Sequence, residues 1–384
     1  MSEKTFVLAP DSFKGSMTAK EVCEAMERGL RKAYPTANYI HVPMADGGEG
    51  TVQSLVDATG GQIHSKEVMG PLGQQVTASY GILGDGITGV IEMASASGIQ
   101  YVTKETENPL IATTYGTGEL ILECLNKGIN KIIIGIGGSA TNDGGTGMAE
   151  ALGAKFLDSE GSALPRGGGS LNKLAAIDIS SLDTRLQQAD IIVACDVSNP
   201  LCGETGASRV FGPQKGATPE MVKQLDTSLA HYAEVVKQQL HKDVRDVPGA
   251  GAAGGLGAGL LIFTQAVLKK GIDIVIEHNG LSEKLKDADL VFTGEGGIDF
   301  QTKFGKVPYG VAKTAKEGGK KVIAVAGRVG EGIDTLYEEG IDAVFGIAPG
   351  AAELGKLLAE GPYNVERTCE NIARVLYLYD KTVK

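Results

Sequence analysis

Short apolar runs rich in β-branched residues recur along this 384-residue chain, and each ends in glycine, aspartate or proline before a helical pattern. This alternation is typical of α/β proteins with parallel strands. Two of these runs precede residue 65 and three follow residue 285. We expect the five to form one open sheet that a second domain interrupts in sequence. The runs are residues 6–9, 39–42, 290–293, 322–326 and 343–347.

The interrupted sheet is expected to be flavodoxin-like and doubly wound, with strand order 2-1-3-4-5. Its domain would comprise residues 1–63 and 276–384, with residues 64–275 as an inserted α/β domain and the active site in the cleft between the two. Thr18 and Glu21 form a capping box that predicts a helix after the first strand. The insert has further strand candidates at 76–80, 89–93, 131–136 and 191–194, and helix candidates at 116–126 and 148–153.

The charge and cysteine content exclude several classes of protein. A net charge of −11 argues against binding to nucleic acid or to an anionic membrane surface, since both require a basic footprint. The five cysteines include no CxxC pair, so neither a disulfide framework nor a zinc site is indicated, and a reducing cytoplasm is expected. Residues 249–268 are uncharged, but their first half is barely hydrophobic, so we do not expect a transmembrane helix.

A glycine-rich turn follows the strand candidate at 131–136 and has the sequence GGSATNDGG at 137–145. Exposed backbone N–H groups at such a turn form a cradle for anions, and the side chains of the segment suit phosphate and metal. The spacing of Gly135, Gly137 and Ala140, with Asp158 downstream, also matches a dinucleotide fingerprint, which leaves a dehydrogenase open. The predicted nucleotide contacts in this loop are Gly137, Gly138, Ser139, Thr141 and Asn142, with Asp143 as a metal ligand.

A second glycine-rich segment, PGAGAAGGLGAG, occupies residues 248–259. It predicts either another anion cradle, through Gly254 and Gly255, or a closely packed helix of small residues, and the sequence favours neither. A P-loop motif and the protein-kinase signatures are absent from the chain.

Acidic residues recur at strand ends, where each one alone is explained as a helix cap or turn former. Together they are the oxygen ligands that Mg²⁺ prefers. Lys14, Lys215 and Lys306 lie in glycine- or proline-containing loops, where a lysine is a phosphate candidate. The acids are Asp11, Asp46, Asp196, Glu295 and Asp299.

Seven motifs in order along nearly the whole chain resemble those of the type I glycerate kinase family. They are APDSFKGS at 9–16, ADGGEGT at 45–51, GGSATNDGG at 137–145, CDVSNPL at 195–201, FGPQKGA at 211–217, the run at 248–259, and TGEG at 293–296 followed by Gln301, Thr302 and GKVP at 305–308. The resemblance implies ATP-dependent phosphorylation of D-glycerate, typically at the 2-hydroxyl, by a flavodoxin-like domain that carries an inserted domain. Many relatives look to have arginine where this chain has Gly297.

Phosphoryl transfer requires positioning, charge neutralisation, a metal and a proton acceptor. We predict that Lys215 contacts the transferring oxygens, that Asp196 is the base through a pKa raised by partial burial, and that Glu295 holds Mg²⁺. Ser12, Lys14 and Asp46 would bind glycerate, and Asp46 and Glu295 are also reserve candidates for base and metal. An NAD-linked hydroxyacid dehydrogenase and a glycerate-binding sensor remain alternatives, and the protein is expected to be a monomer or homodimer.

Overall fold

The computed structural model describes residues 4–382 and divides the chain into two compact units. Unit 1 comprises the chain up to Asp46, Gln53–Gly60 and the chain from Ile272 onward, and unit 2 comprises Gly47–Val52 and Gly61–Gly271. The units therefore divide at 60/61 and 271/272, where the sequence predicted 63/64 and 275/276. The sequence did not predict that Gly47–Val52 belongs to unit 2.

Unit 1 contains a five-stranded parallel sheet with the order β13-β12-β11-β1-β2. Numbered within the unit, this order reads 5-4-3-1-2, so β1 lies between a strand from early in the chain and one from late in it. Each of the five predicted runs contributes to one of these strands, which confirms those assignments. The strands are β1 Thr5–Leu8, β2 Asn38–His41, β11 Leu290–Ile298, β12 Val322–Val329 and β13 Ala343–Gly346.

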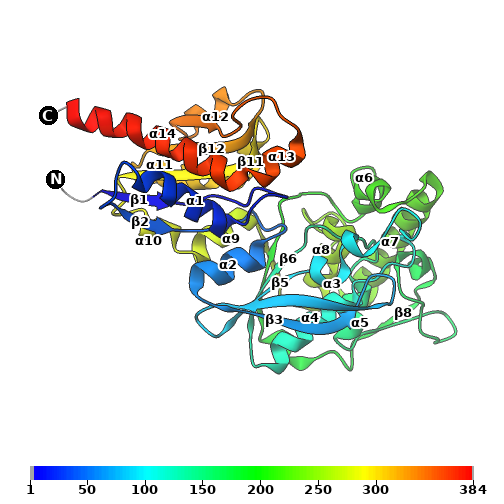
Figure 1. The fold of residues 1–384 in the computed structure, drawn as a ribbon. Helices are drawn as coiled ribbons and strands as arrows, with labels where there is room; N and C mark the ends of the chain where they lie inside the picture. Colours follow the sequence, from blue (N-terminus) through cyan, green and yellow to red (C-terminus); the bar gives the residue numbers. More distant parts are fainter. Residues whose placement is uncertain (1–3, 383–384) are drawn as a thin grey trace. The chain divides into compact units, whose positions relative to one another are not determined.

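Helix α1 (Ala19–Arg31) begins with the predicted capping box, in which Thr18 and Glu21 satisfy each other's backbone N–H groups. Its apolar face and that of α14 (Gly361–Thr382) cover the same side of the sheet, and the two helices run alongside each other (Figure 1). The other helices assigned wholly or mainly to unit 1 are α2 Thr51–Thr59, α9 Gly271–His278, α10 Leu281–Lys284, η5 Thr302–Phe304, α11 Val307–Glu317, α12 Asp334–Glu338 and α13 Leu354–Ala359.

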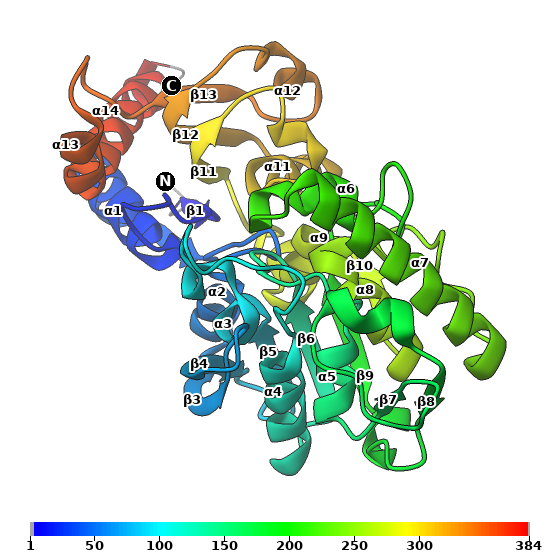
Figure 2. The same cartoon turned by 90° about the vertical axis from the view of Figure 1, so that its right-hand side faces the viewer.

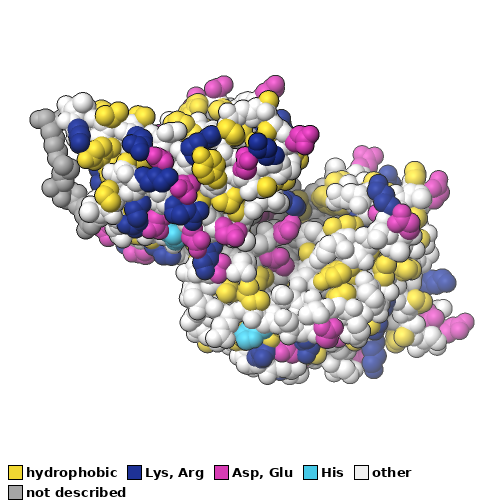
Figure 3. Space-filling model, viewed as in Figure 1, with side chains coloured by type: hydrophobic (Ala, Val, Ile, Leu, Met, Phe, Trp, Pro, Cys, Tyr) yellow, Lys and Arg dark blue, Asp and Glu magenta, His cyan; other side chains and the backbone are white. Residues whose placement is uncertain are grey.

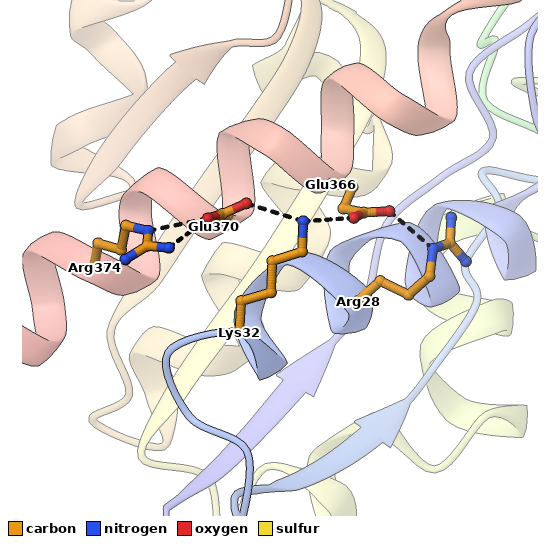
Figure 4. Close-up of polar contacts among 5 residues, drawn as sticks. All are labelled: Arg28, Lys32, Glu366, Glu370 and Arg374. Carbon is orange, nitrogen blue, oxygen red and sulfur yellow. Dashed lines mark hydrogen bonds and ion pairs between the residues drawn. The ribbon is translucent and has the colours of Figure 1, made fainter.

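Charged side chains bridge the outer faces of α1 and α14 (Figure 4). Glu366 pairs with Arg28 and Lys32, and Glu370 pairs with Lys32 and Arg374, at distances of 2.7–3.1 Å. Figure 3 shows acidic and basic side chains interleaved over this part of unit 1. Because the pairs are solvent-exposed, each contributes at most about 1 kcal/mol, and the buried apolar face holds the two helices together.

Unit 2 contains a six-stranded mixed sheet with the order β10-β9-β6-β5-β4-β3 (Figure 2). The pairs β5–β6, β6–β9 and β9–β10 are parallel, whereas β3–β4 and β4–β5 are antiparallel. The four predicted runs fall in β4, β5, β6 and β9. The strands are β3 Gln62–Met69, β4 Gln75–Ile82, β5 Thr88–Glu92, β6 Lys131–Gly135, β9 Asp190–Ala194 and β10 Val267–Lys269, with a separate pair β7 Lys155–Leu157 and β8 Ala176–Asp178.

Helix α8 (Ala252–Phe263) lies between two apolar clusters of unit 2 and contributes residues to both. Its small residues therefore permit close packing on all sides. Within residues 4–382, the structure has no helix of the length and apolarity needed to cross a membrane. The remaining helices of unit 2 are α3 Ala94–Ser97, η1 Ile99–Tyr101, α4 Tyr115–Asn126, α5 Thr146–Ala151, η2 Gly168–Lys173, η3 Thr184–Gln187, α6 Ala207–Phe211, η4 Pro213–Lys215 and α7 Pro219–Leu240.

Candidate active-site residues

The carboxyl end of β1 carries Asp11, which the strand order places beside the end of β11. The Asp11 N–H donates to the Gly294 carbonyl at 2.8 Å, and the Ser12 N–H donates to Asp11 Oδ1 at 2.6 Å. These bonds extend the β1–β11 pairing and fix the carboxylate at the edge where parallel sheets bind ligands.

A tight turn follows Asp11 and presents Lys14. Phe13 and Met17 exchange backbone hydrogen bonds of 2.9 and 3.0 Å, and this pairing closes the turn around the exposed lysine. A side chain at Gly296 would lie 3.7 Å from the Lys14 amide, so this turn passes directly over the glycine segment of β11. Ser12, Lys14 and Glu295, predicted separately from sequence, therefore gather at one edge of unit 1.

Three carboxylates interact at this edge. Burial raises the pKa of Asp11 to about 7, and the negative charges of Asp46 and Glu295 raise it further. Burial also raises the pKa of Glu295, against the opposing effects of Lys306 and Thr302. A carboxyl group with a pKa near neutrality is suited to accept a proton at physiological pH.

Glu295 is held by two partners of its own unit. Thr302 Oγ1 donates to Glu295 Oε1 at 2.9 Å, and Lys306 Nζ lies 3.3 Å from Oε2. Among residues 4–382, no three His, Cys, Asp or Glu side chains are grouped closely enough to hold a metal ion by themselves. Proteins commonly bind Mg²⁺ through one or two carboxylates together with substrate phosphates, and Glu295 fits that pattern.

In unit 2, the glycine loop after β6 is exposed only in its first part. Gly137 and Gly138 are exposed and Ser139 is half-buried, whereas residues 140–149 are buried. Within the described chain, the amides of Gly137 and Gly138 have no acceptor. Gly138 has a φ of +73°, which favours glycine. These free amides form the part of the loop that an anion could reach.

Lys215 lies behind this exposed segment and is only 2% exposed. Its Nζ donates to Ser139 Oγ at 2.7 Å and to the Thr141 carbonyl at 2.6 Å. Burial lowers the pKa of Lys215 to about 7, and the charge of Asp143 opposes the shift only in part. The structure thus brings together two of the residues predicted from separate motifs, Ser139 and Lys215.

The contacts of Asp143 do not fit a metal ligand. Its side chain is fully buried and accepts four hydrogen bonds: from the Thr114 amide and hydroxyl and from the amides of Gly145 and Gly147. Four donors occupy the acceptor positions of a carboxylate. Asp143 therefore fixes the loop to Thr114 and to the start of α5, and the sequence prediction of a metal role is not supported by this geometry.

Thr141 and Asn142 are also fully buried. The Asn142 amide donates to Ser208 Oγ at 2.9 Å, which fixes the loop to α6. Within residues 4–382, Thr141 Oγ1 and Asn142 Oδ1 have no hydrogen-bond partner. Direct nucleotide contact by these two side chains remains a prediction.

Gly254 and Gly255 pack against the glycine loop itself. Both have positive φ, +67° and +90°. A side chain at Gly254 would lie 2.0 Å from the Thr141 carbonyl, and one at Gly255 would lie 2.7 Å from Gly144 Cα. These glycines thus allow the backbone of α8 to pack closely on the backbone of the glycine loop. This favours the close-packing interpretation over a second anion cradle.

Gly254→Ala is expected to destabilise the protein by roughly 3 kcal/mol, because it combines a left-handed backbone with a clash against buried backbone. Gly73→Ala is the matched control, since Gly73 has a φ of +88° but open space around an added side chain. Thermal melts of both variants should show the larger loss for Gly254→Ala. Equal losses would mean that backbone strain alone matters at Gly254.

Asp196 follows β9 and is exposed, so the partial burial expected from sequence is wrong. Its Oδ1 accepts the amide of Gly271, the first residue of α9, at 3.1 Å. A side chain at Gly47 would approach Asp196 Oδ2 to 3.7 Å. The geometry shows a helix-capping contact.

Two further groups at these edges have no assigned role in the sequence predictions. The sequence shows Asp11 as an acid at a strand end, but only the structure shows that it is close to Asp46 and Glu295. Glu92 ends the apolar run of β5 and accepts the Val52 amide at 2.9 Å. The sequence signal that could have identified Glu92 is an acidic residue at the end of an apolar run.

Comparison with known proteins places these features in one family. The model of the glycerate kinase family matches residues 6–377. A glycerate kinase from Haemophilus influenzae is 55% identical over 97% of this chain and 98% of its own length, and the glycerate 2-kinase of Escherichia coli K12 is 54% identical over 96% and 97%. A crystal structure from Salmonella typhimurium LT2, described as a candidate glycerate kinase 2, superposes with a TM-score of 0.90 at 50% identity and covers 98% of this chain and 99% of its own.

Both the sequence and the fold are therefore shared over nearly the full length of these proteins. The chain belongs to the glycerate kinase family and is an enzyme of that family.

Proposed function

We propose that this protein transfers the γ-phosphoryl group of ATP to D-glycerate and forms 2-phosphoglycerate and ADP. The observation that carries the proposal is full-length identity above 50% to proteins named glycerate kinase, among them one named glycerate 2-kinase. We further assign the chain to the type I branch and unit 1 to the flavodoxin-like folds, on the basis of its motifs and its strand order. The reaction would take place in the cytoplasm.

In unit 2, the exposed amides of Gly137 and Gly138 and the Ser139 hydroxyl are proposed to bind the nucleotide phosphates. Backbone N–H groups in a turn present several donors to one anion. The buried ammonium group of Lys215 would contribute positive charge to the phosphate site indirectly, because it donates a hydrogen bond to the Ser139 hydroxyl. The buried hydrogen bonds of Asp143 and Asn142 keep the loop in shape.

In unit 1, Ser12 and Lys14 are proposed to orient glycerate, with Asp46 as a further substrate contact. Glu295 would hold Mg²⁺, which neutralises phosphate charge when bound. We assign the role of base to Asp11 in preference to Asp196. A pKa of about 7 in Asp11 matches the requirement of a base, and the cause of that pKa is burial among other carboxylates.

The proposal is tested by measuring ADP formation from ATP in the presence and absence of D-glycerate. Glycerate-dependent ADP supports a kinase, whereas reduction of NAD with glycerate supports a dehydrogenase. The ³¹P NMR signal of the product identifies the hydroxyl: a phosphate at carbon 2 couples to one proton, and a phosphate at carbon 3 couples to two. Omitting Mg²⁺ should abolish turnover, and a triplet from the product would exclude 2-phosphoglycerate.

The assignment of the base predicts that Asp196→Asn keeps kcat within about threefold of the wild type, because asparagine can also accept the Gly271 amide. Its melting temperature should fall slightly. A loss of roughly 10² to 10⁴ in kcat at an unchanged melting temperature would restore Asp196 as the base.

A further inference from the structure

The first turn of helix α2 receives its cap from a distant residue. The residue before Thr51 is Gly50, which has no side chain to accept the orphan amides of the helix. Glu92 Oε1, at the carboxyl end of β5, accepts the Val52 amide at 2.9 Å. Burial raises the pKa of Glu92, and the amides of Val52, Gly50 and Thr51 oppose this shift by stabilising the charged form.

The segment before α2 lies on the same sheet edge as the exposed glycine loop. A side chain at Gly135 would lie 2.8 Å from the Gly47 carbonyl, and a side chain at Gly137 would lie 3.6 Å from Gly48 Cα. A side chain at Gly47 would lie 2.8 Å from Ala194 Cβ. Gly47 and Gly48 thus run across the ends of β6 and β9, beside Gly137.

Hydrogen bonds made by Thr51 and by Glu92 help to hold this segment in place. The Thr51 amide and hydroxyl both bond the Gly48 carbonyl, at 3.3 and 2.8 Å, and so close the loop on itself. Glu92 then anchors the closed loop to β5, which is paired with β6 through Glu92 and Gly135. Without the carboxylate, the Val52 amide would lose its hydrogen bond to the end of β5.

We propose that Glu92 is a positioning residue for the phosphate site: it holds residues 47–50 beside Gly137, so that this segment forms one wall of the site. The inference rests on the proposed function, because it takes Gly137 and Gly138 to bind nucleotide phosphates. Glu92 itself contacts no substrate.

The test compares Glu92→Ala with Glu119→Ala by calorimetric titration with ADP and by steady-state kinetics. Glu119 is the matched control, because its Oε2 accepts the Met69 amide, 50 residues away in sequence, at 2.7 Å. Glu92→Ala should weaken ADP binding about tenfold or more and raise the KM for ATP. Glu119→Ala should lower the melting temperature similarly and leave ADP affinity within about twofold.

Glu92→Gln retains an oxygen acceptor for Val52 and should recover most of the ADP affinity. If Glu92→Ala does not fold, Thr51→Val replaces it, since it removes the hydroxyl bond to Gly48 and should also weaken ADP. Unchanged ADP affinity in folded Glu92→Ala or in Thr51→Val, or an equal loss in Glu119→Ala, would overturn the inference. A wild type that binds ADP but does not phosphorylate glycerate would overturn the proposed function alone.

Discussion

Lys215→Met is expected to reduce kcat/KM for ATP by about 10² to 10³, because it removes the buried cation that acts on the phosphates through the Ser139 hydroxyl. The effect should depend on pH. Since the pKa of Lys215 is lowered to about 7, the wild-type kcat/KM should fall as the free enzyme loses this proton above that pH. Steady-state kinetics between pH 6 and 9 measure both effects.

Lys242→Met is the control for Lys215→Met. Lys242 Nζ also donates to two backbone carbonyls, of Leu261 at 3.2 Å and Ile262 at 2.6 Å, but it lies away from the glycine loop. The Lys242→Met variant should be less stable than the wild type and should keep its kcat/KM.

The stability of the wild type relative to Lys215→Met should also depend on pH. The pKa of Lys215 is lowered in the folded protein, whereas unfolded chains hold this proton up to about pH 10, so this relative stability should rise from pH 7 to 10. An unchanged kcat/KM in Lys215→Met would remove Lys215 from the site.

Asp11→Asn is expected to lower kcat by roughly 10² to 10⁴ while raising the melting temperature by several degrees. Asparagine keeps an acceptor for the Ser12 amide but removes a charge that is buried beside Asp46 and Glu295. Activity and stability would thus change in opposite directions, as expected where a catalytic group is held at a cost to folding. A variant with wild-type kcat would exclude Asp11 as the base.

The stability difference between Asp11→Asn and the wild type should follow pH with a defined sign. The folded-state pKa of Asp11 is about 7, above the usual value of 3.8, so the wild type loses stability as pH rises through this window. The two proteins should therefore melt alike below pH 4 and differ most above pH 7. Asp85→Asn should behave oppositely: although burial disfavours its charge, the Thr88 hydroxyl and the Ile87 and Thr88 amides hold the pKa of Asp85 below its usual range.

The sequence predicted the strands that carry an apolar run, including the half-exposed β2 and β13, and missed β3, β7, β8 and β10. The runs in β6 and β11 are continuous and apolar because successive residues, which point to opposite faces of the sheet, are buried. β3 escaped prediction because most of its residues are exposed or half-buried, including Lys66 and Glu67 at an antiparallel edge. Period-2 alternation is weak in such a strand.

The site residues divide in a similar way. Motif reasoning found Ser139 and Lys215, which contact each other across 76 residues of sequence. It left a ligand role open for Gly254, because glycine is needed wherever backbone approaches anything closely, and sequence alone does not say whether a ligand or the protein's own chain approaches. The environments of Asp11 and Asp196 also depend on long-range neighbours, which no local pattern records.

The position of β1 in the middle of its sheet has a consequence for synthesis on the ribosome. β1 ends at Leu8, and its neighbour β11 begins at Leu290, so about 280 residues are made between the two. At 5–20 residues per second, this takes roughly 15 to 60 s. Unit 2 ends at Gly271 and is complete before β11 emerges. During most of translation, one edge of β1 therefore has no partner strand, and the apolar Phe6 and Leu8 lie in this strand. We expect ribosome-associated chaperones to bind the amino-terminal segment during this time.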